Sequence, residues 1–402
     1  SLKFASYKIG HFEIMRKVLS RPNRLRLVDI SNHGGVGLFS QTEIGNVLSD
    51  FSNSDTLQTL RLRGRETSIR GVPAASDHLP NDFLDKIGVP PLLTDFEAAH
   101  FNIHWDRIPT IPTLTRLHLD NLSPHRPSQA NFLQSLQGMP RLQDLRLSGM
   151  LPRGPFASTG SPVSLPAIRR LELRAAVAEI CEFLLGTRIP GTASLNIRVD
   201  GLSPTPESTS QFLAALTTNW IFLEGRCASR TSLREIRYTS TENLMRSPEF
   251  QFWFGDNSPA MSKPITHRET PDLVFTVGEE LQFDEHITVI DKHLGLSTLR
   301  YLTFHESYFG VPLRTWNNTF AGLQSLTAIR WWMPFNAGMS TFVESLLGDP
   351  ALSAVKPKGK GRGRARKQRN RGKSNQAGTS TPTNALVSAV PRFPGLRSLH
   401  FH

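Results

Sequence analysis

A short leucine-based phrase that recurs at a nearly constant interval constrains this chain more than any other feature. The pattern Leu-x-x-Leu-x-Leu, with isoleucine also accepted, begins at Leu114, Leu142 and Ile168, at spacings of 28 and 26 residues. A proline stands two residues before each of these copies. A period of about 20–29 residues is typical of leucine-rich repeats.

The phrase has a direct structural meaning. Alternating side chains of a strand point to opposite faces, so both leucines of Leu-x-Leu point to one face. Between the first two copies, Gln129–Gln137 places Phe132, Leu133 and Leu136 on one side at helical spacing. One such unit cannot close a core, so copies stack with their strands parallel. We therefore predict an α/β fold, a right-handed leucine-rich-repeat solenoid or horseshoe of roughly ten repeats, with a parallel concave sheet and convex helices.

Further copies of the phrase extend the prediction along most of the chain. Complete or degenerate copies begin at Leu57, Leu93, Leu233, Leu299, Leu326 and Leu396. Shorter strands are predicted at Leu25–Ile30, Ile197–Val199 and Phe275–Val277. Apolar residues at helical spacing predict helices over His11–Leu19, Gln41–Phe51, Val177–Gly186, Asp284–Leu294 and Thr341–Leu347.

The period breaks at two places. Between Thr239 and Pro271 the sequence reads as an insertion or as a repeat with a long loop, and its aromatic cluster Phe250–Phe254 is either irregular core or an exposed contact. We expect residues 1–32 to form a connection and first strand, residues 33–354 the solenoid, and residues 391–402 a last, truncated strand. Residues 355–390 have a composition unsuited to burying apolar surface and are predicted to be a disordered insertion.

The positive charge of the chain is concentrated in that insertion. The net charge is +12, and the part outside the run 356–373 is nearly balanced. The run is open to three interpretations: a solvated loop, a nuclear-import signal, or a nucleic-acid contact through phosphates. Its interleaved glycines, in place of aromatics, argue against base stacking. Its basic residues are Lys356, Lys358, Lys360, Arg362, Arg364, Arg366, Lys367, Arg369, Arg371 and Lys373.

Composition also limits the environment and the chemistry. The sequence has no apolar run of the ~20 residues that a membrane helix needs, and Ser1–Gly10 has no signal-peptide core. Two cysteines, Cys181 and Cys227, exclude a disulfide scaffold, so we expect a cytoplasmic or nuclear protein without a membrane partner. Because the chain begins with Ser1, we expect it to be a fragment.

No motif predicts catalysis, a metal or a cofactor. Gly372-Lys373-Ser374 lacks the earlier glycine of a phosphate-binding loop. His286 and His293 lie seven residues apart, which is not the spacing of a helical zinc site. No Gly-x-Ser-x-Gly nucleophile elbow is present. We therefore expect a binding protein with no catalytic residue, no cofactor and no metal.

Alternation also predicts which side chains meet a partner. If Leu60 and Leu62 point inward, Arg61 points out on the concave face, and so does the equivalent residue of every copy. An arginine-rich row of this kind suits an acidic or phosphorylated protein segment; alternatively, neighbouring acids pair the arginines internally. Trp332 is expected to face outward and Trp331 inward. The predicted row is Arg61, Glu97, His118, Arg146, Glu172, Arg198, Arg237, Thr276, Thr303, Arg330 and His400.

These residues together resemble a known family. The segment from about Leu79 to Asp200, with Leu79-Pro-Asn-Asp-Phe83 and Asn102-Ile-His-Trp105-Asp106 ahead of the Pro-x-Leu-x-x-Leu-x-Leu strands, resembles the leucine-rich region of fungal F-box proteins. The resemblance implies a substrate-recognition subunit of a Skp–cullin–F-box ubiquitin ligase. It also implies that the Skp adaptor and cullin are held through an F-box, which is not visible in this sequence. The alternatives are a scaffold outside any ligase and a nuclear protein that contacts nucleic acid through the basic run.

Overall fold

The fold is seen in a computed structural model. It describes residues 2–5, 17–21, 24–31, 55–64, 77–78, 91–102, 105, 111–120, 126–153, 161–200, 205–221, 232–239, 248–255, 270–276, 283–305, 311–332, 341–343, 345–346 and 393–401. The predicted helix Gln41–Phe51, most of the predicted helix His11–Leu19, Cys227 and the basic insertion 355–390 lie outside these residues.

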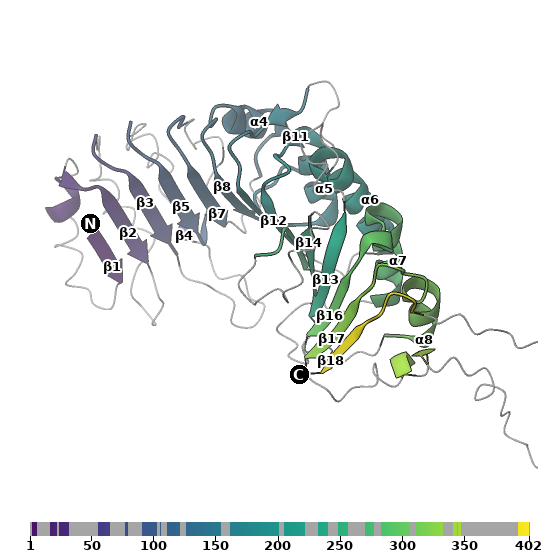
Figure 1. The fold of residues 1–402 in the computed structure, drawn as a ribbon. Coiled ribbons are helices and arrows are strands. Elements are labelled where there is room, and N and C mark those ends of the chain that lie inside the picture. The colour runs from purple at the N-terminus through teal and green to yellow at the C-terminus, as the bar shows by residue number, and fades with distance from the viewer. Residues whose placement is uncertain are drawn as a thin grey trace, which may run out of the picture.

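A single large sheet of 14 strands organises the described part of the chain (Figure 1). In its first half each strand lies parallel to the next one along the row. The register is constant: Leu60, Phe96, Leu117, Leu145 and Leu171 lie side by side. These strands are β1 (Leu2–Ala5), β2 (Leu27–Ser31), β3 (Thr59–Arg63), β5 (Asp95–Ala99), β7 (Arg116–Asp120), β8 (Asp144–Ser148), β10 (Arg170–Ala175) and β12 (Ser194–Val199).

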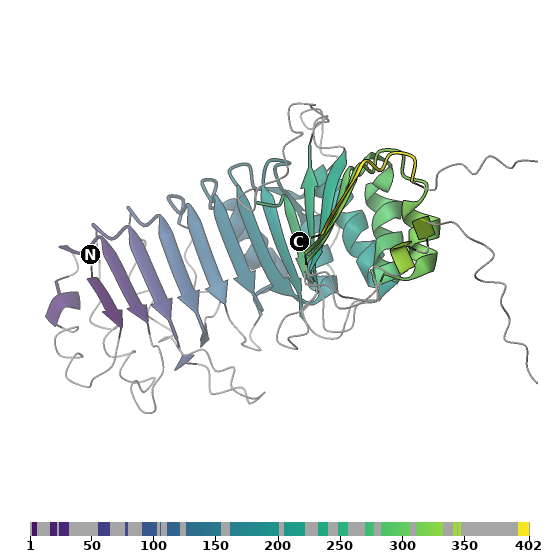
Figure 2. The ribbon, with the colours of Figure 1, turned by 60° about the horizontal axis from the view of Figure 1, so that its bottom comes forward.

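The second half of the sheet departs from simple stacking. The order after β12 is β15 (Leu273–Thr276), β14 (Glu249–Phe254), β13 (Leu233–Thr239), β16 (Tyr301–His305), β17 (Ala328–Trp332) and β18 (Ser398–Phe401). Strand β14 is antiparallel to both β13 and β15. The chain thus reverses direction after β13. In a regular solenoid β13 would pair with β12, but here β15 takes that place. In both views the sheet changes direction at this point (Figures 1 and 2).

The helices pack against one face of the sheet. They include α4 (Gln129–Gln137), α5 (Val177–Gly186), α6 (Pro206–Leu216), α7 (Phe283–Leu294) and α8 (Leu313–Thr315), with π-helical turns at Thr217–Ile221 and Trp316–Phe320 and a 3-10 turn at Leu296–Thr298. Residues 17–19, 341–343 and 345–346 are also helical. Two short strand pairs, β4 (Asp77–His78) with β6 (Phe101–Asn102) and β9 (Val163–Ser164) with β11 (Thr187–Arg188), stand apart from the large sheet. No described helix lies on the opposite side, which we call the helix-free face (Figure 1).

Local sequence explains where α4 and α6 begin. Ser128 caps α4 by accepting a hydrogen bond from the backbone N–H of Asn131. Thr205 caps α6 in the same way, and Pro206 follows at the first helical position, where its missing N–H costs no hydrogen bond.

The described helices include none long and apolar enough to cross a membrane.

The core lies between the helices and the strands. The leucines of the phrase from Leu57 to Leu326 are almost completely buried, with Leu145 at 0% exposure, whereas Leu399 of the last copy is 37% exposed. In the second half aromatic side chains replace leucine: Phe212 of α6 stacks on Phe275 of β15, and Phe283 of α7 contacts Tyr238 of β13 and Phe304 of β16. Phe250 and Phe252 are fully buried, so the interpretation of this aromatic stretch as core is correct for these two residues.

Two predicted strands are shifted by two residues. In β12 the buried pair is Leu195 and Ile197, while Val199 is half-buried, so the phrase begins earlier than predicted. In β15 the buried pair is Leu273 and Phe275, and the strand ends at Thr276. In each case a further apolar residue, Val199 or Val277, continues the alternating pattern, so the sequence predicts an inward pair two residues too late.

Removing one repeat leucine tests the register. Leu145 lies at the centre of the leucine ladder, so Leu145→Ala should lower the free energy of unfolding by about 2–5 kcal/mol through lost burial and a cavity. Denaturant titration followed by circular dichroism measures this loss. Leu185→Ala is the matched control, because Leu185 of α5 is 48% exposed and a surface change of this kind costs within about 0.5 kcal/mol. Equal losses for both variants would contradict the assigned core.

A buried histidine between α6 and α7 makes stability pH-dependent. His286 lies 3.1 Å from the hydroxyl of Thr209, and burial lowers its pKa to about 4, against a small opposing effect of Asp284. The unfolded chain binds a proton near the ordinary value of 6.5, while the folded chain resists it, so stability falls as pH drops from about 6.5 to about 4.

His286→Gln should flatten this part of the pH profile, removing on the order of 2–3 kcal/mol of acid-induced loss. Unfolding free energies measured at several pH values between 7 and 4 test it. His400→Gln, at an exposed site on β18, serves as the control. An unchanged slope in His286→Gln would refute the assigned protonation.

Candidate protein-binding face

One row of side chains crosses the helix-free face from β2 to β18. Each member lies beside the next through the register of neighbouring strands. Nine of the predicted residues, Arg61, Glu97, His118, Arg146, Glu172, Arg237, Thr303, Arg330 and His400, occupy this row as expected. The complete row is Asp29, Arg61, Glu97, His118, Arg146, Glu172, Asn196, Val274, Gln251, Arg237, Thr303, Arg330 and His400.

The predicted places of Arg198 and Thr276 in this row are wrong. Asn196 and Val274 take those positions, while Arg198 and Thr276 lie beside each other two residues further along their strands. The shift of the buried pairs in β12 and β15 moves their outward side chains by the same two residues. Arg198 is exposed and pairs in register with Arg174 of β10.

In the first half of the face, arginines and carboxylates of adjacent strands form ion pairs. Arg61 donates to Asp95 Oδ2 at 2.5 Å. Arg63 donates Nε and Nη2 to the two oxygens of Glu97 at 2.6 and 2.9 Å. Such bidentate contacts are the strongest form of this interaction. Arg116 adds a second donor to Asp95 at 3.3 Å.

The same pattern continues through the next strands. His118 Nδ1 lies 3.4 Å from Glu97 Oε1. Arg146 Nε donates to Asp144 at 3.2 Å and lies 3.9 Å from Glu172. We call the set Arg61, Arg63, Asp95, Glu97, Arg116, His118, Asp144, Arg146 and Glu172 the ion-pair lattice. Each of its arginines donates at least one hydrogen bond to a neighbouring acid, which favours internal pairing over an open anionic site in this half.

Glu97 is the electrostatic centre of the lattice. Burial by itself raises the pKa of this carboxyl, but hydrogen bonds from His118 and Arg63, together with their charges, outweigh burial and lower the pKa to about 2. The folded state therefore strongly prefers the ionised carboxylate.

The second half of the face is built differently. The guanidinium of Arg237 lies over the ring of Trp253 and that of Arg330 lies over the ring of Tyr301, each 4.9 Å from the ring centroid. Both distances fall within the range of cation–π contacts. Together with Glu235 these residues form what we call the arginine–aromatic cluster. Its strands β14, β13, β16 and β17 are neighbours in the sheet.

Glu235 lies under the two arginines and is 0% exposed. Its Oε1 accepts a hydrogen bond from Thr303 at 3.3 Å and lies 3.7 Å from Arg237 and 4.0 Å from Arg330. Its Oε2 is buried without a hydrogen-bond partner among the described residues. Burial raises the pKa of Glu235, and the nearby arginines only partly oppose that effect.

The arginines of this cluster were predicted, Glu235 is one of the neighbouring acids of the internal-pairing alternative, and Trp253 belongs to the predicted aromatic stretch Phe250–Phe254; only Tyr301 was not predicted. Glu235 and Tyr301 lie two residues before Arg237 and Thr303, so alternation along the strand places them on the same face as the row. The position of Trp253 beside Glu235 follows from the antiparallel pairing of β14 with β13, which the repeat pattern does not predict. Trp331 is buried and Trp332 half-exposed beside His305, as predicted.

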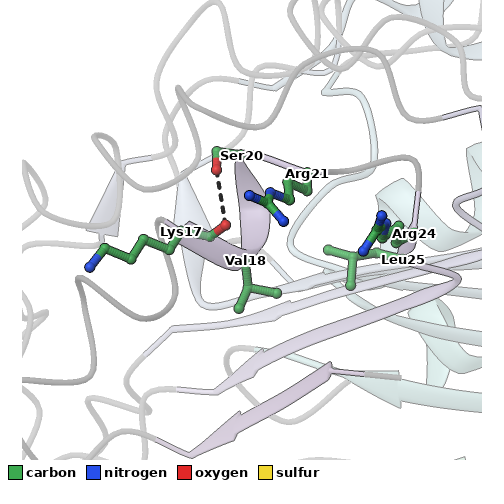
Figure 3. Close-up of a pocket in the computed structure, with 6 residues that line it drawn as sticks. All are labelled: Lys17, Val18, Ser20, Arg21, Arg24 and Leu25. Carbon is green, nitrogen blue, oxygen red and sulfur yellow. Dashed lines mark hydrogen bonds between the residues drawn. The ribbon is translucent and has the colours of Figure 1, made fainter.

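A second feature lies at the other end of the sheet. A cavity of about 470 Å³ is lined by Lys17, Val18, Ser20, Arg21, Arg24 and Leu25. Lys17 extends away from the two arginines, so the three cations do not converge on one point (Figure 3).

The described residues offer no group of three or more histidine, cysteine, aspartate or glutamate side chains placed to hold a metal. Burial, with the charge of Glu182, raises the pKa of Cys181 to about 11, which leaves it a thiol at neutral pH and a poor nucleophile.

A scan of the sequence against models of known protein families finds no match, and a search of curated proteins finds no significant match.

Neutralising Glu97 tests the lattice. Glu97→Gln keeps the shape but removes the charge that Arg63 and His118 stabilise, so it should lower stability at neutral pH by on the order of 2–3 kcal/mol. The carboxylate stabilises the fold above its ordinary pKa of 4.5, and this contribution disappears as pH falls toward about 2. The difference between the variant and the wild type should therefore vanish in that window. Exposed Glu285→Gln is the control; a pH-independent difference for Glu97→Gln would contradict the mechanism.

Proposed function

We propose that the chain is a non-enzymatic protein-recognition module, and that its helix-free face is the binding surface. The observation that carries the proposal is the continuous row of side chains from β2 to β18, polar or charged at every position except Val274 and flanked by half-exposed Trp332. A broad sheet face of this kind, free of described helices, presents many side chains from a fixed backbone, as protein-binding surfaces require.

The fold proposed for this role is the leucine-rich-repeat solenoid. The repeating phrase, the constant parallel register of the first half and the helices on one side support it. In such a solenoid the sheet lines the concave side, so the helix-free face corresponds to the extended inner surface that repeat proteins use for binding. The antiparallel strand β14 is an interruption of this plan.

The two halves of the face have different roles in this proposal. The ion-pair lattice holds its own charges and acts as a rigid, nearly neutral platform. The second half concentrates tryptophan, tyrosine and arginine, the residue types enriched at interface hot spots. Trp332, Arg237 and Arg330 are therefore the residues we assign to partner contact, with exposed Arg198 beyond the lattice as a further candidate.

The resemblance of the sequence to fungal F-box proteins supports a specific setting. In it the chain selects substrates for a Skp–cullin–F-box ubiquitin ligase, and an F-box in the same polypeptide binds the Skp adaptor. A binding face without catalytic groups suits this division of labour, because the chemistry of ubiquitin transfer belongs to other subunits.

Affinity capture tests the ligase setting. The tagged full-length product of the gene is expected to recover the Skp adaptor and a cullin, identified by mass spectrometry, whereas the segment Ser1–His402 alone is not. Failure of the full-length product to recover either would refute the ligase setting and favour a scaffold. Salt-sensitive retention of RNA or DNA that is lost on deleting residues 355–390 would favour nucleic-acid association instead.

Trp332→Ala in the full-length product tests the binding face. It should lose co-purifying substrate proteins at least about tenfold, as hot-spot truncations do, and should retain the adaptor. Lys292→Ala, at an exposed site on the helix-covered side, is the matched control. Unchanged recovery of the same proteins by Trp332→Ala would exclude this part of the face.

A further inference from the structure

The two halves of the helix-free face differ in how their arginines are satisfied. In the ion-pair lattice, Arg61 and Arg63 reach carboxylate oxygens at 2.5 and 2.6 Å. In the arginine–aromatic cluster, the nearest carboxylate contacts of Arg237 and Arg330 are 3.7 and 4.0 Å, beyond hydrogen-bonding distance. The cluster therefore contains charge attraction without the hydrogen bonds that normally accompany it.

Among the described residues, no carboxylate lies within hydrogen-bonding distance of either guanidinium of the cluster. Each guanidinium carries five N–H donors in a fixed plane, and Nε of Arg237 is buried without a partner among the described residues. The side chains of Arg237 and Arg330 keep 16% and 11% exposure. Stacking on Trp253 and Tyr301 fixes the two planes, so little further entropy is lost when an anion binds.

The charge balance of the cluster favours an anion. Two guanidinium groups approach Glu235 Oε1 from two strands, β13 and β17, and one carboxylate faces both. The cluster thus carries one excess positive charge. An anion placed between the guanidiniums would meet the geometry that arginine uses for carboxylates and phosphates.

We propose that Arg237 and Arg330 anchor an acidic side chain, carboxylate or phosphorylated, of an extended partner segment, and that this anion replaces Glu235 as the charge partner of the two guanidinium groups. The proposal rests on the proposed function only in requiring that a protein partner reach the helix-free face. Glu235 is then a built-in competitor that holds the two arginines in place while the site is empty.

The surroundings of Glu235 are consistent with this exchange. Its hydrogen bond comes from Thr303, not from either arginine, so the arginines lose no hydrogen bond when an anion replaces Glu235 as their partner. The charged groups acting on Glu235 are Arg330, Arg237 and Arg234, and burial nevertheless disfavours its charged form. A neutral Glu235 would leave both guanidiniums to the incoming anion.

Peptide binding to the purified chain tests the proposal. Fluorescein-labelled short peptides with randomised flanks and a central serine, glutamate, phosphoserine or lysine are titrated by fluorescence anisotropy. The glutamate or the phosphoserine pool should bind at least about tenfold more tightly than the serine pool, and the comparison of the two acidic pools identifies the source of the anion. The lysine pool should bind no better than the serine pool.

Substitutions with opposite expected signs separate recognition from folding. Glu235→Gln removes the competitor and should tighten binding of the acidic pool about threefold to tenfold, whereas Arg330→Gln should weaken it about tenfold or more. Arg330→Lys keeps the charge but loses the planar fork, so its affinity for the acidic pool should lie between those of the wild type and Arg330→Gln. Lys292→Gln, at an exposed site of α7 on the helix-covered side, is the matched control and should leave peptide binding unchanged. Thermal unfolding of every variant identifies any that fails to fold, in which case Arg330→Lys and Glu235→Gln carry the test.

Three results would overturn the proposal. Equal binding of the serine and acidic pools would show that the site does not recognise an anion. Weaker binding of the acidic pool by Glu235→Gln would show that Glu235 does not compete with the anion. Preference for a single-stranded RNA oligonucleotide over every peptide pool would assign the arginines to another class of ligand. The assay contains no adaptor or cullin, so a failed affinity capture leaves this proposal standing, and a failed peptide assay leaves the ligase setting standing.

Discussion

Burial of one ladder of apolar side chains at constant register is the constraint on which the rest of this structure depends. Leu117, Leu145 and Leu171 lie side by side beneath the sheet, and a slip of one residue would turn each of them toward the opposite face. Because the ladder cannot slip, the alternate side chains of the same strands are also held in register. The order of charges on the helix-free face is therefore a consequence of the core.

This coupling explains how a charged surface stays ordered. Exposed ion pairs contribute little when their side chains must be fixed from a mobile state, but here adjacent strands lie about 4.8 Å apart and present each arginine directly beside a carboxylate. Arg63 and Glu97, half-exposed and buried respectively, form a bidentate pair on this basis. Because the register is constant, opposite charges of the ion-pair lattice lie side by side, and this part of the face is nearly neutral.

The interruption at β14 gives the second half its different character. An antiparallel strand inserted between β13 and β15 brings Trp253 beside Glu235 and Arg237, a combination that strict repetition of the phrase would not produce. Aromatic rings also replace leucine in the core there, from Phe212 to Trp331. The departure from regular stacking and the site we assign to partner contact therefore coincide in the fold.

Repeat spacing and alternation are enough to predict several elements and most of the row. Helices Gln129–Gln137 and Val177–Gly186 form at their predicted bounds, because caps and apolar spacing act over a few residues. Nine members of the row follow from alternation alone. The strand order around β14 and the shifted registers of Arg198 and Thr276 follow from the folded sheet instead, because pairing between distant strands depends on which edges are free when the sheet forms. The folded sheet also decides which arginines form hydrogen-bonded ion pairs, since the carboxylates that pair with Arg61, Arg63 and Arg116 come from other strands.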